Sequence, residues 1–186
     1  MHMKNALKTI GAVALSVLIG MASPRLVLAG DWVTTSHTVT IAVPDVLSIS
    51  ADTADFTLAF EGYVGINDES SAETVTYTVE SNNMRQDDGA AAINANLDFE
   101  YDRIALKADV GTYTKTAGNT ELVEAGSGFV TIGTSNVTLA NKGNTEEGSD
   151  GKTLKGSLPI TYKAVALADV PSGDQIHTLY VTLTTI

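Results

Sequence analysis

The chain has 186 residues and no cysteine, and its 22 acidic residues outnumber its 11 basic ones to give a formal net charge of −11. Without Cys, disulfides, Cys-ligated zinc and a lipid anchor on a Cys are all excluded. The acidic balance argues against binding to nucleic acid or to an anionic membrane surface, because both need clustered Lys and Arg.

The N-terminal segment has the pattern of a secretory signal peptide. Lys4 and Lys8 precede an apolar run over residues 10–22. As a helix this run would be roughly 20 Å long, too short to cross a bilayer core of about 30 Å. Val27-Leu28-Ala29 then fits a signal peptidase site. A cut after Ala22 and an N-terminal anchor that is never cut are the alternatives.

We therefore expect residues 1–29 to be the signal peptide and residues 30–186 to be the exported domain. Cleavage would remove three basic residues and no acid, which lowers the net charge from −11 to −14. No second long apolar run follows, so we expect no stable membrane insertion. The predicted location is secreted, in a periplasm or at the cell surface.

Beyond the signal, apolar and polar residues alternate with period 2, as is typical of β-strands. In chain order we expect strands over residues 33–43, 46–50, 56–60, 74–81, 97–101, 104–108, 129–132, 137–139, 154–165 and 177–186. Residues 90–95 fit either a helical turn or a strand, and residues 97–108 a strand pair or one strand bent at Asp102. Pro44 should end the first strand, and Pro159 suggests an edge or a bulge, because proline has no N–H for the ladder.

Turn residues separate these segments. Loops are expected over residues 61–73, 82–89 and 141–152, with a tight turn over 169–174 and mixed character over 111–128. Eight or nine short alternating strands predict a single all-β domain, an immunoglobulin-like β-sandwich whose sheets each have one wet face.

The two ends of this domain carry a family resemblance. Thr38-Val39-Thr40-Ile41-Ala42-Val43-Pro44 with Val46-Leu47-Ser48-Ile49, and Pro171-Ser172-Gly173-Asp174 with the alternating segment 178–184, resemble the first strands, last turn and terminal strand of secreted pilin-like and spore-coat-U-like β-sandwich subunits. Ile176 and His177 stand where those families usually have Tyr, and the disulfide common in several of them is absent.

The resemblance implies a surface, coat or filament subunit that assembles by strand donation, in which an extended segment completes an open sheet edge through main-chain hydrogen bonds. Residues 33–43 would be such a donor. Alternatively, they are the first strand of their own sandwich, which we favour because amphipathic terminal strands are ordinary in sandwiches.

The sequence shows no catalytic motif. Gly-x-Ser-x-Gly, His-Glu-x-x-His and a Walker-type phosphate loop are all absent. His37 and His177 lie far apart in predicted strands and are not expected to share a metal. Asn136-Val137-Thr138 is a glycosylation sequon, relevant only in a host that modifies such sites.

The sequence implies no cofactor, and calcium is the best candidate for a bound metal. It prefers carboxylate, amide and carbonyl oxygens. A candidate loop offers Asn141, Asn144, Glu146, Glu147 and Asp150. Their spacing does not match an EF-hand, and Gly-rich acidic loops are common without metal.

The predicted function is a non-enzymatic extracellular structural protein: a surface, coat or pilus-like filament subunit that self-assembles. The alternative is a monomeric secreted adhesin or carbohydrate-binding module that uses loops 61–73 and 141–152 for adhesion. A secreted enzyme ranks third.

Overall fold

The computed structural model describes residues 36–84 and 91–185. The chain forms two compact units, residues 1–41 and 42–186. The predicted signal peptide and residues 85–89 of the predicted loop 82–89 lie outside the described residues. The described part of the first unit, residues 36–41, is exposed and has no regular secondary structure. Among the described residues, no helix has the length and apolar character that a membrane span requires.

The second unit is all-β, as predicted, and its described residues contain no helix. Its ten strands are β1 (Leu47–Ala51), β2 (Glu73–Ser81), β3 (Ala91–Leu97), β4 (Ile104–Val110), β5 (Thr114–Gly118), β6 (Thr120–Glu124), β7 (Val130–Ile132), β8 (Val137–Thr145), β9 (Leu154–Ala166) and β10 (Leu179–Thr185). They form two antiparallel sheets. The first has the order β1-β2-β9-β4-β7, with β5 also paired to β9, and the second has the order β10-β3-β8-β6.

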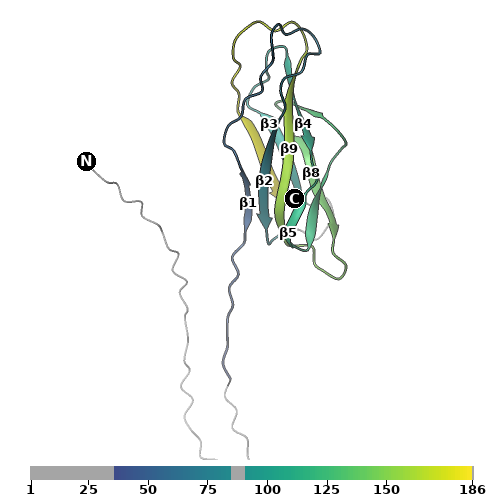
Figure 1. Ribbon diagram of the computed structural model, residues 1–186. Helices are drawn as coiled ribbons and strands as arrows, with labels where there is room; N and C mark the ends of the chain where they lie inside the picture. Colours follow the sequence, from purple (N-terminus) through teal and green to yellow (C-terminus); the bar gives the residue numbers. More distant parts are fainter. Residues whose placement is uncertain (1–35, 85–90, 186) are drawn as a thin grey trace, which may run out of the picture. The chain divides into compact units, whose positions relative to one another are not determined.

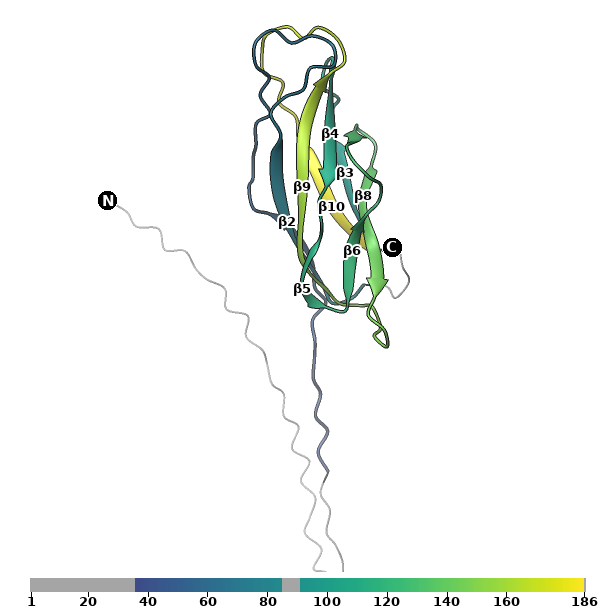
Figure 2. The same cartoon turned by 45° about the vertical axis from the view of Figure 1, so that its right-hand side comes forward.

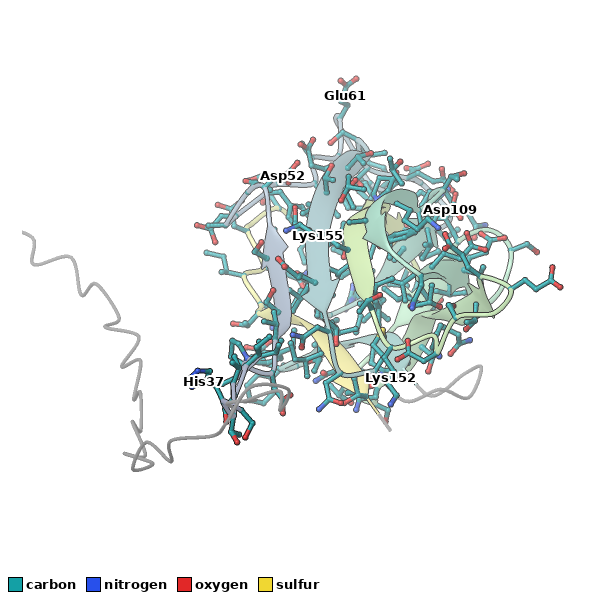
Figure 3. All side chains as sticks on the ribbon, turned by 90° about the horizontal axis from the view of Figure 1, so that it is seen from below. His37, Asp52, Glu61, Asp109, Lys152 and Lys155 are labelled. Carbon is teal, nitrogen blue, oxygen red and sulfur yellow. The ribbon has the colours of Figure 1, made fainter. Side chains whose placement is uncertain are left out.

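The sheets lie face to face in a sandwich-like arrangement, visible as two layers of strands in Figure 1. Figure 3 looks up from below and shows the side chains that fill the space between them. Alternation along each strand sends one set of side chains inward. The core therefore draws on both sheets, with buried residues Val75, Tyr77, Val79, Leu106, Leu158, Ile160 and Tyr162 from the first and Ile93, Ala95, Leu97, Leu122, Leu139 and Leu183 from the second.

Strand β9 is the central strand of the first sheet. It pairs with β2 along one side, and along the other with β4 and β5, which follow one another in line (Figure 2). Pro159 therefore lies in a central strand, and an edge position was the wrong prediction. Its carbonyl accepts the N–H of Gly111 at 2.8 Å, so its missing N–H faces the interruption between β4 and β5 rather than β2.

The two ends of β9 define two ends of the second unit. The base is the end where β2 stops and β9 starts, since Ser81 pairs with Leu154. The tip is the opposite end, where residues 61–69 run beside residues 165–170 through bridges at Val64 and Glu69. The chain enters β1 at the base and β10 runs back toward it, because Thr185 pairs with Ala91 at the start of β3.

Several predicted elements need correction. Residues 36–43 and 56–60 alternate as strands do, but neither segment has a strand partner among the described residues. Residues 91–97 are strand, one of the two alternatives left open for 90–95. Of the predicted strand 97–101 only Leu97 is in a strand, and β3 and β4 belong to different sheets, so residues 97–108 are neither a strand pair nor one bent strand. Strand β8 continues to Thr145, into the segment that we expected to be loop.

Candidate functional site

One side of the second unit is open, in the sense that both sheets end there in an edge strand with an unpaired side among the described residues. Strands β1 and β10 are the outermost strands of their sheets on this side, and each pairs with only one neighbour among the described strands. Both lack any charged residue, Pro or Gly. On the opposite side, β7 is only three residues long and β6 carries two glutamates. Short or charged edges protect a sheet against pairing with other chains, so only the β1/β10 side lacks this protection.

A large groove lies between the sheets on this open side, and its lining mixes apolar and polar residues. Its volume is about 1160 Å³. Its walls include Ile49 of β1, Tyr77 of β2, Leu106 of β4 and Val181 of β10. A well-packed domain leaves few voids larger than a water molecule, so the sheets are not fully closed against each other here.

Residues 53–58 run along this groove, and we call them the strap. Phe56 and Leu58 point inward and are half-buried, while Thr57 between them is exposed. Hydrogen bonds hold each end. The Asp52 N–H donates to the Thr76 carbonyl at 3.0 Å on one side, and the N–H of Ser71 donates to the Ala59 carbonyl at 2.8 Å on the other.

Two buried tyrosines form the floor beneath the strap. The Tyr77 and Tyr162 hydroxyls are 2.9 Å apart and hydrogen-bonded. Phe56 stacks on the ring of Tyr162, with centroids 5.1 Å apart and planes 23° from parallel. Burial raises the pKa of both phenols above the ordinary value, so both stay neutral at physiological pH.

At the tip end of the groove, Asp98 joins the β3–β4 connection to the start of β10. Its Oδ1 accepts the N–H of Phe99 at 2.8 Å and of Thr178 at 2.9 Å, and His177 Nδ1 lies 3.5 Å away. Partial burial opposes ionisation of Asp98, but these two N–H donors and the nearby imidazole outweigh it and lower its pKa. The ring of Tyr101 meets His177 edge-on at 4.4 Å.

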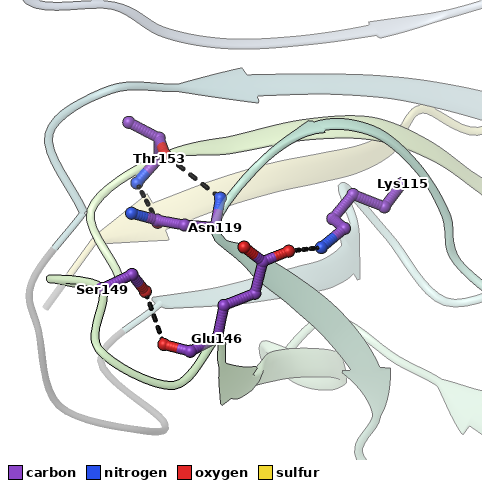
Figure 4. Close-up of polar contacts among 5 residues, drawn as sticks. All are labelled: Lys115, Asn119, Glu146, Ser149 and Thr153. Atoms are coloured by element: carbon purple, nitrogen blue, oxygen red, sulfur yellow. Dashed lines mark hydrogen bonds and ion pairs between the residues drawn. The ribbon is translucent and has the colours of Figure 1, made fainter.

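The predicted calcium ligands lie at the base, on β8 and in the loop that follows it. Glu146 forms an ion pair with Lys115 (Figure 4). Asp150 accepts a hydrogen bond from Asn119 Nδ2 at 3.0 Å. The hydrogen bond from Asn119, with the N–H of Lys152, lowers the pKa of Asp150.

Asn141 lies on β8, Glu147 is exposed, and the side chain of Asn144 lies outside the described part. Within residues 36–84 and 91–185, no three His, Asp or Glu side chains are placed to hold one metal ion. Two of the five candidates are thus engaged with protein partners, and calcium binding stays a prediction.

At the base, Asn119 forms hydrogen bonds to the loop that follows β8. It is the single residue between β5 and β6, where the chain crosses from the first sheet to the second. Its Oδ1 accepts the N–H of Thr153 at 3.0 Å, and its own N–H donates to the Thr153 hydroxyl at 3.1 Å (Figure 4). These bonds, with the one to Asp150, fix the loop after β8.

The two loops proposed for a binding module do not meet. Residues 61–69 lie at the tip and residues 146–153 at the base, separated by the length of β9. Thirteen residues of strand span roughly 40 Å. At the tip, Tyr63 and Ile66 are 79% and 64% exposed, and Glu61 stands out from the surface in Figure 3. Adhesion would have to use one loop or the other.

Residues 44–46 are fixed at the base by Asn82. Its Nδ2 donates to the Pro44 carbonyl at 2.8 Å, and the Val46 N–H donates to Asn82 Oδ1 at 2.7 Å. Just before this anchor, Val39, Ile41 and Val43 are 79%, 83% and 73% exposed. Their alternation with Thr38, Thr40 and Ala42 was visible in the sequence, but the groove, the strap and the unprotected edges were not, because they depend on which strands end up outermost.

In comparisons with known proteins, no family model, no curated protein and no solved structure matches this chain.

Proposed function

We propose that this protein is an exported, non-enzymatic structural subunit that assembles into a surface layer, coat or filament by strand addition at its β1/β10 side. In this proposal residues 1–29 direct export and are removed. Residues 36–43 of one copy then add to the open side of another and complete an immunoglobulin-like sandwich. The observation that carries the proposal is the unprotected β1/β10 side above a groove whose walls carry apolar side chains from both sheets.

Residues 36–43 have an apolar face that suits the apolar side chains on the walls of the groove. Val39, Ile41 and Val43 fall on one face of an extended segment, and β-branched residues are favoured in strands. An added strand would pair its backbone with a free edge and place these three side chains against the apolar walls, which is the β-augmentation mode of recognition. Val39, Ile41 and Val43 are exposed to water in the free chain, so their burial would favour assembly.

Negative-stain electron microscopy and light scattering of the protein spanning residues 30–186 test this proposal. We expect polymers or a ladder of oligomers. Ile41→Lys, which puts a charge on the apolar face, should abolish them. Thr40→Lys adds the same charge to the neighbouring residue on the other face and is the matched control, which should still assemble. A protein that stays monomeric at high concentration, or equal assembly by both variants, would count against the proposal.

The alternative is an adhesin or carbohydrate-binding module that uses the tip. It is favoured by the exposed Tyr63, because aromatic rings are common contacts for ligands. Binding to a glycan array that is lost in Tyr63→Ala, with assembly absent, would support this alternative instead. Mass spectrometry of the exported protein would test the predicted cleavage before Gly30.

A further inference from the structure

We infer that the strap, residues 53–58, is an exchangeable cover that closes the groove in the free subunit and opens without unfolding of the two sheets. The inference rests on the proposed function for its biological meaning, because the surface beneath the strap is where the added strand would bind. Its physical basis lies in how the strap is held.

The backbone of the strap lacks the bonds of a strand. Every strand of the two sheets has a ladder partner, whereas residues 54–58 make no backbone–backbone hydrogen bond among the described residues. The Asp55 carbonyl accepts a local bond from the Thr53 hydroxyl at 2.9 Å, which lies within the strap itself. The sequence Asp55-Phe56-Thr57-Leu58 alternates as a strand does, but only side chains hold it. Opening the middle of the strap therefore breaks no ladder, in contrast to opening β2 or β9.

The side chains of the strap are also loosely held. Phe56 and Leu58 are only half-buried and border the groove, whereas Val79 of β2 and Tyr162 of β9 are fully buried. Regions with few buried contacts and exposed hydrogen bonds open locally at a lower free energy than the core. The strap meets both conditions.

The points that must release are the two ends. At the first end Asp52 bonds to Thr76, through both its N–H and its Oδ1, and at the second end Ala59 bonds to Ser71. All these bonds are at exposed positions, where water competes for them. Release of the second end would swing Phe56 and Leu58 away and uncover Tyr77 and Tyr162 for a partner strand.

Amide hydrogen exchange on the Ile41→Lys variant of the protein spanning residues 30–186, which should stay monomeric, tests opening in the free subunit. After correction for intrinsic rates, we expect the Ser71 amide to exchange more than about 30-fold faster than the Val79 amide, and with little dependence on urea, as local opening requires. A smaller difference, or the same urea dependence for both amides, would overturn the inference.

A disulfide across the second end tests whether opening matters for strand addition. Ser71 bonds to the Ala59 backbone through its N–H at 2.8 Å and its hydroxyl at 3.1 Å, so the two residues lie side by side as a disulfide requires, and the chain has no other Cys. In the monomeric Ile41→Lys background, the Ala59→Cys/Ser71→Cys variant, oxidised, should bind a fluorescent peptide of residues 36–46 at least about tenfold more weakly than the same variant reduced. Equal binding by both forms would overturn the inference. If neither form binds the peptide, and the protein without the cysteines does not bind it either, the proposed function fails. The exchange rates alone then test whether the strap opens.

Discussion

The hydroxyl pair of Tyr77 and Tyr162 gives the sharpest test of the packing beneath the groove. Tyr162 is 0% exposed and Tyr77 is 7% exposed, and their oxygens are 2.9 Å apart. Tyr162→Phe would leave the Tyr77 hydroxyl buried without this partner. The expected cost is about 1–3 kcal/mol of unfolding free energy, and Tyr77→Phe should cost about the same, because an unpaired buried polar group loses water without compensation.

The double variant Tyr77→Phe/Tyr162→Phe should be much more stable than the sum of the singles implies. With both hydroxyls removed, no unpaired group is left in the core, and we expect a total cost below about 1 kcal/mol. The coupling between the two sites should then exceed about 1 kcal/mol.

Urea denaturation followed by far-ultraviolet circular dichroism measures these free energies. Tyr180→Phe is the matched control: Tyr180 lies on β10 and is 50% exposed, and its substitution should change stability by less than about 0.5 kcal/mol. Additive effects of the two core substitutions, or single costs no larger than the control, would refute the reasoning.

The same pair predicts an alkaline limit of stability. Burial raises the pKa of both tyrosines in the folded state, while an unfolded tyrosine titrates at about 10. Stability from the neutral phenols is therefore complete below about pH 10 and decreases as pH rises above it, because only the unfolded chain can then lose these protons. The double Phe variant should show a smaller decrease.

Three further predictions concern other parts of the domain. Gly156→Ala should destabilise by about 1–3 kcal/mol or more, since its Cβ would lie 2.4 Å from the Thr114 carbonyl oxygen, whereas Gly126→Ala, with no atom within 4 Å, should be close to neutral in the same urea titration. Asn119→Ala removes two side-chain hydrogen bonds at the crossing between the sheets and should cost about 1–3 kcal/mol; Asn119→Asp should cost at least as much at pH 7, because it replaces the donor to Asp150 with a second carboxylate. Asp98→Asn should lower stability at pH 7, because a carboxyl with a lowered pKa stabilises the fold fully above its unfolded pKa of about 3.9. That effect is lost as pH falls through the folded-state pKa, so in acid the difference between the variant and the wild type should shrink.

Alternation in the sequence was a good guide to strands that are buried on one face. The prediction for 74–81 matches β2, and the inward residues Leu179, Val181 and Leu183 of β10 are buried or half-buried as expected. The same pattern was misleading at residues 36–43 and 56–60. Alternation reports an amphipathic extended segment, but a strand also needs a neighbour for its backbone, and that neighbour is a long-range property.

Polar composition was misleading in the opposite direction at the end of β8. Residues 141–145 read Asn-Lys-Gly-Asn-Thr and suggest a loop, yet they pair with β6, and Lys142 is only 2% exposed. Register with a distant strand outweighs local preference there. The candidate site could not be predicted either. The sequence shows that β10 is uncharged, but its position at an open edge follows from the order of strands in the sheet.

The path of the chain through the base also determines which surface the protein can present. The described chain enters through Pro44 and Val46 at the base and leaves β10 toward that same end, so the tip carries neither connection. Any copy tethered through one of these connections, to a neighbour or to a solid support, holds Tyr63 and Ile66 outward. Fluorophores or affinity handles placed before residue 44 would leave that surface unobstructed, and an array of tethered copies would display it in a uniform orientation.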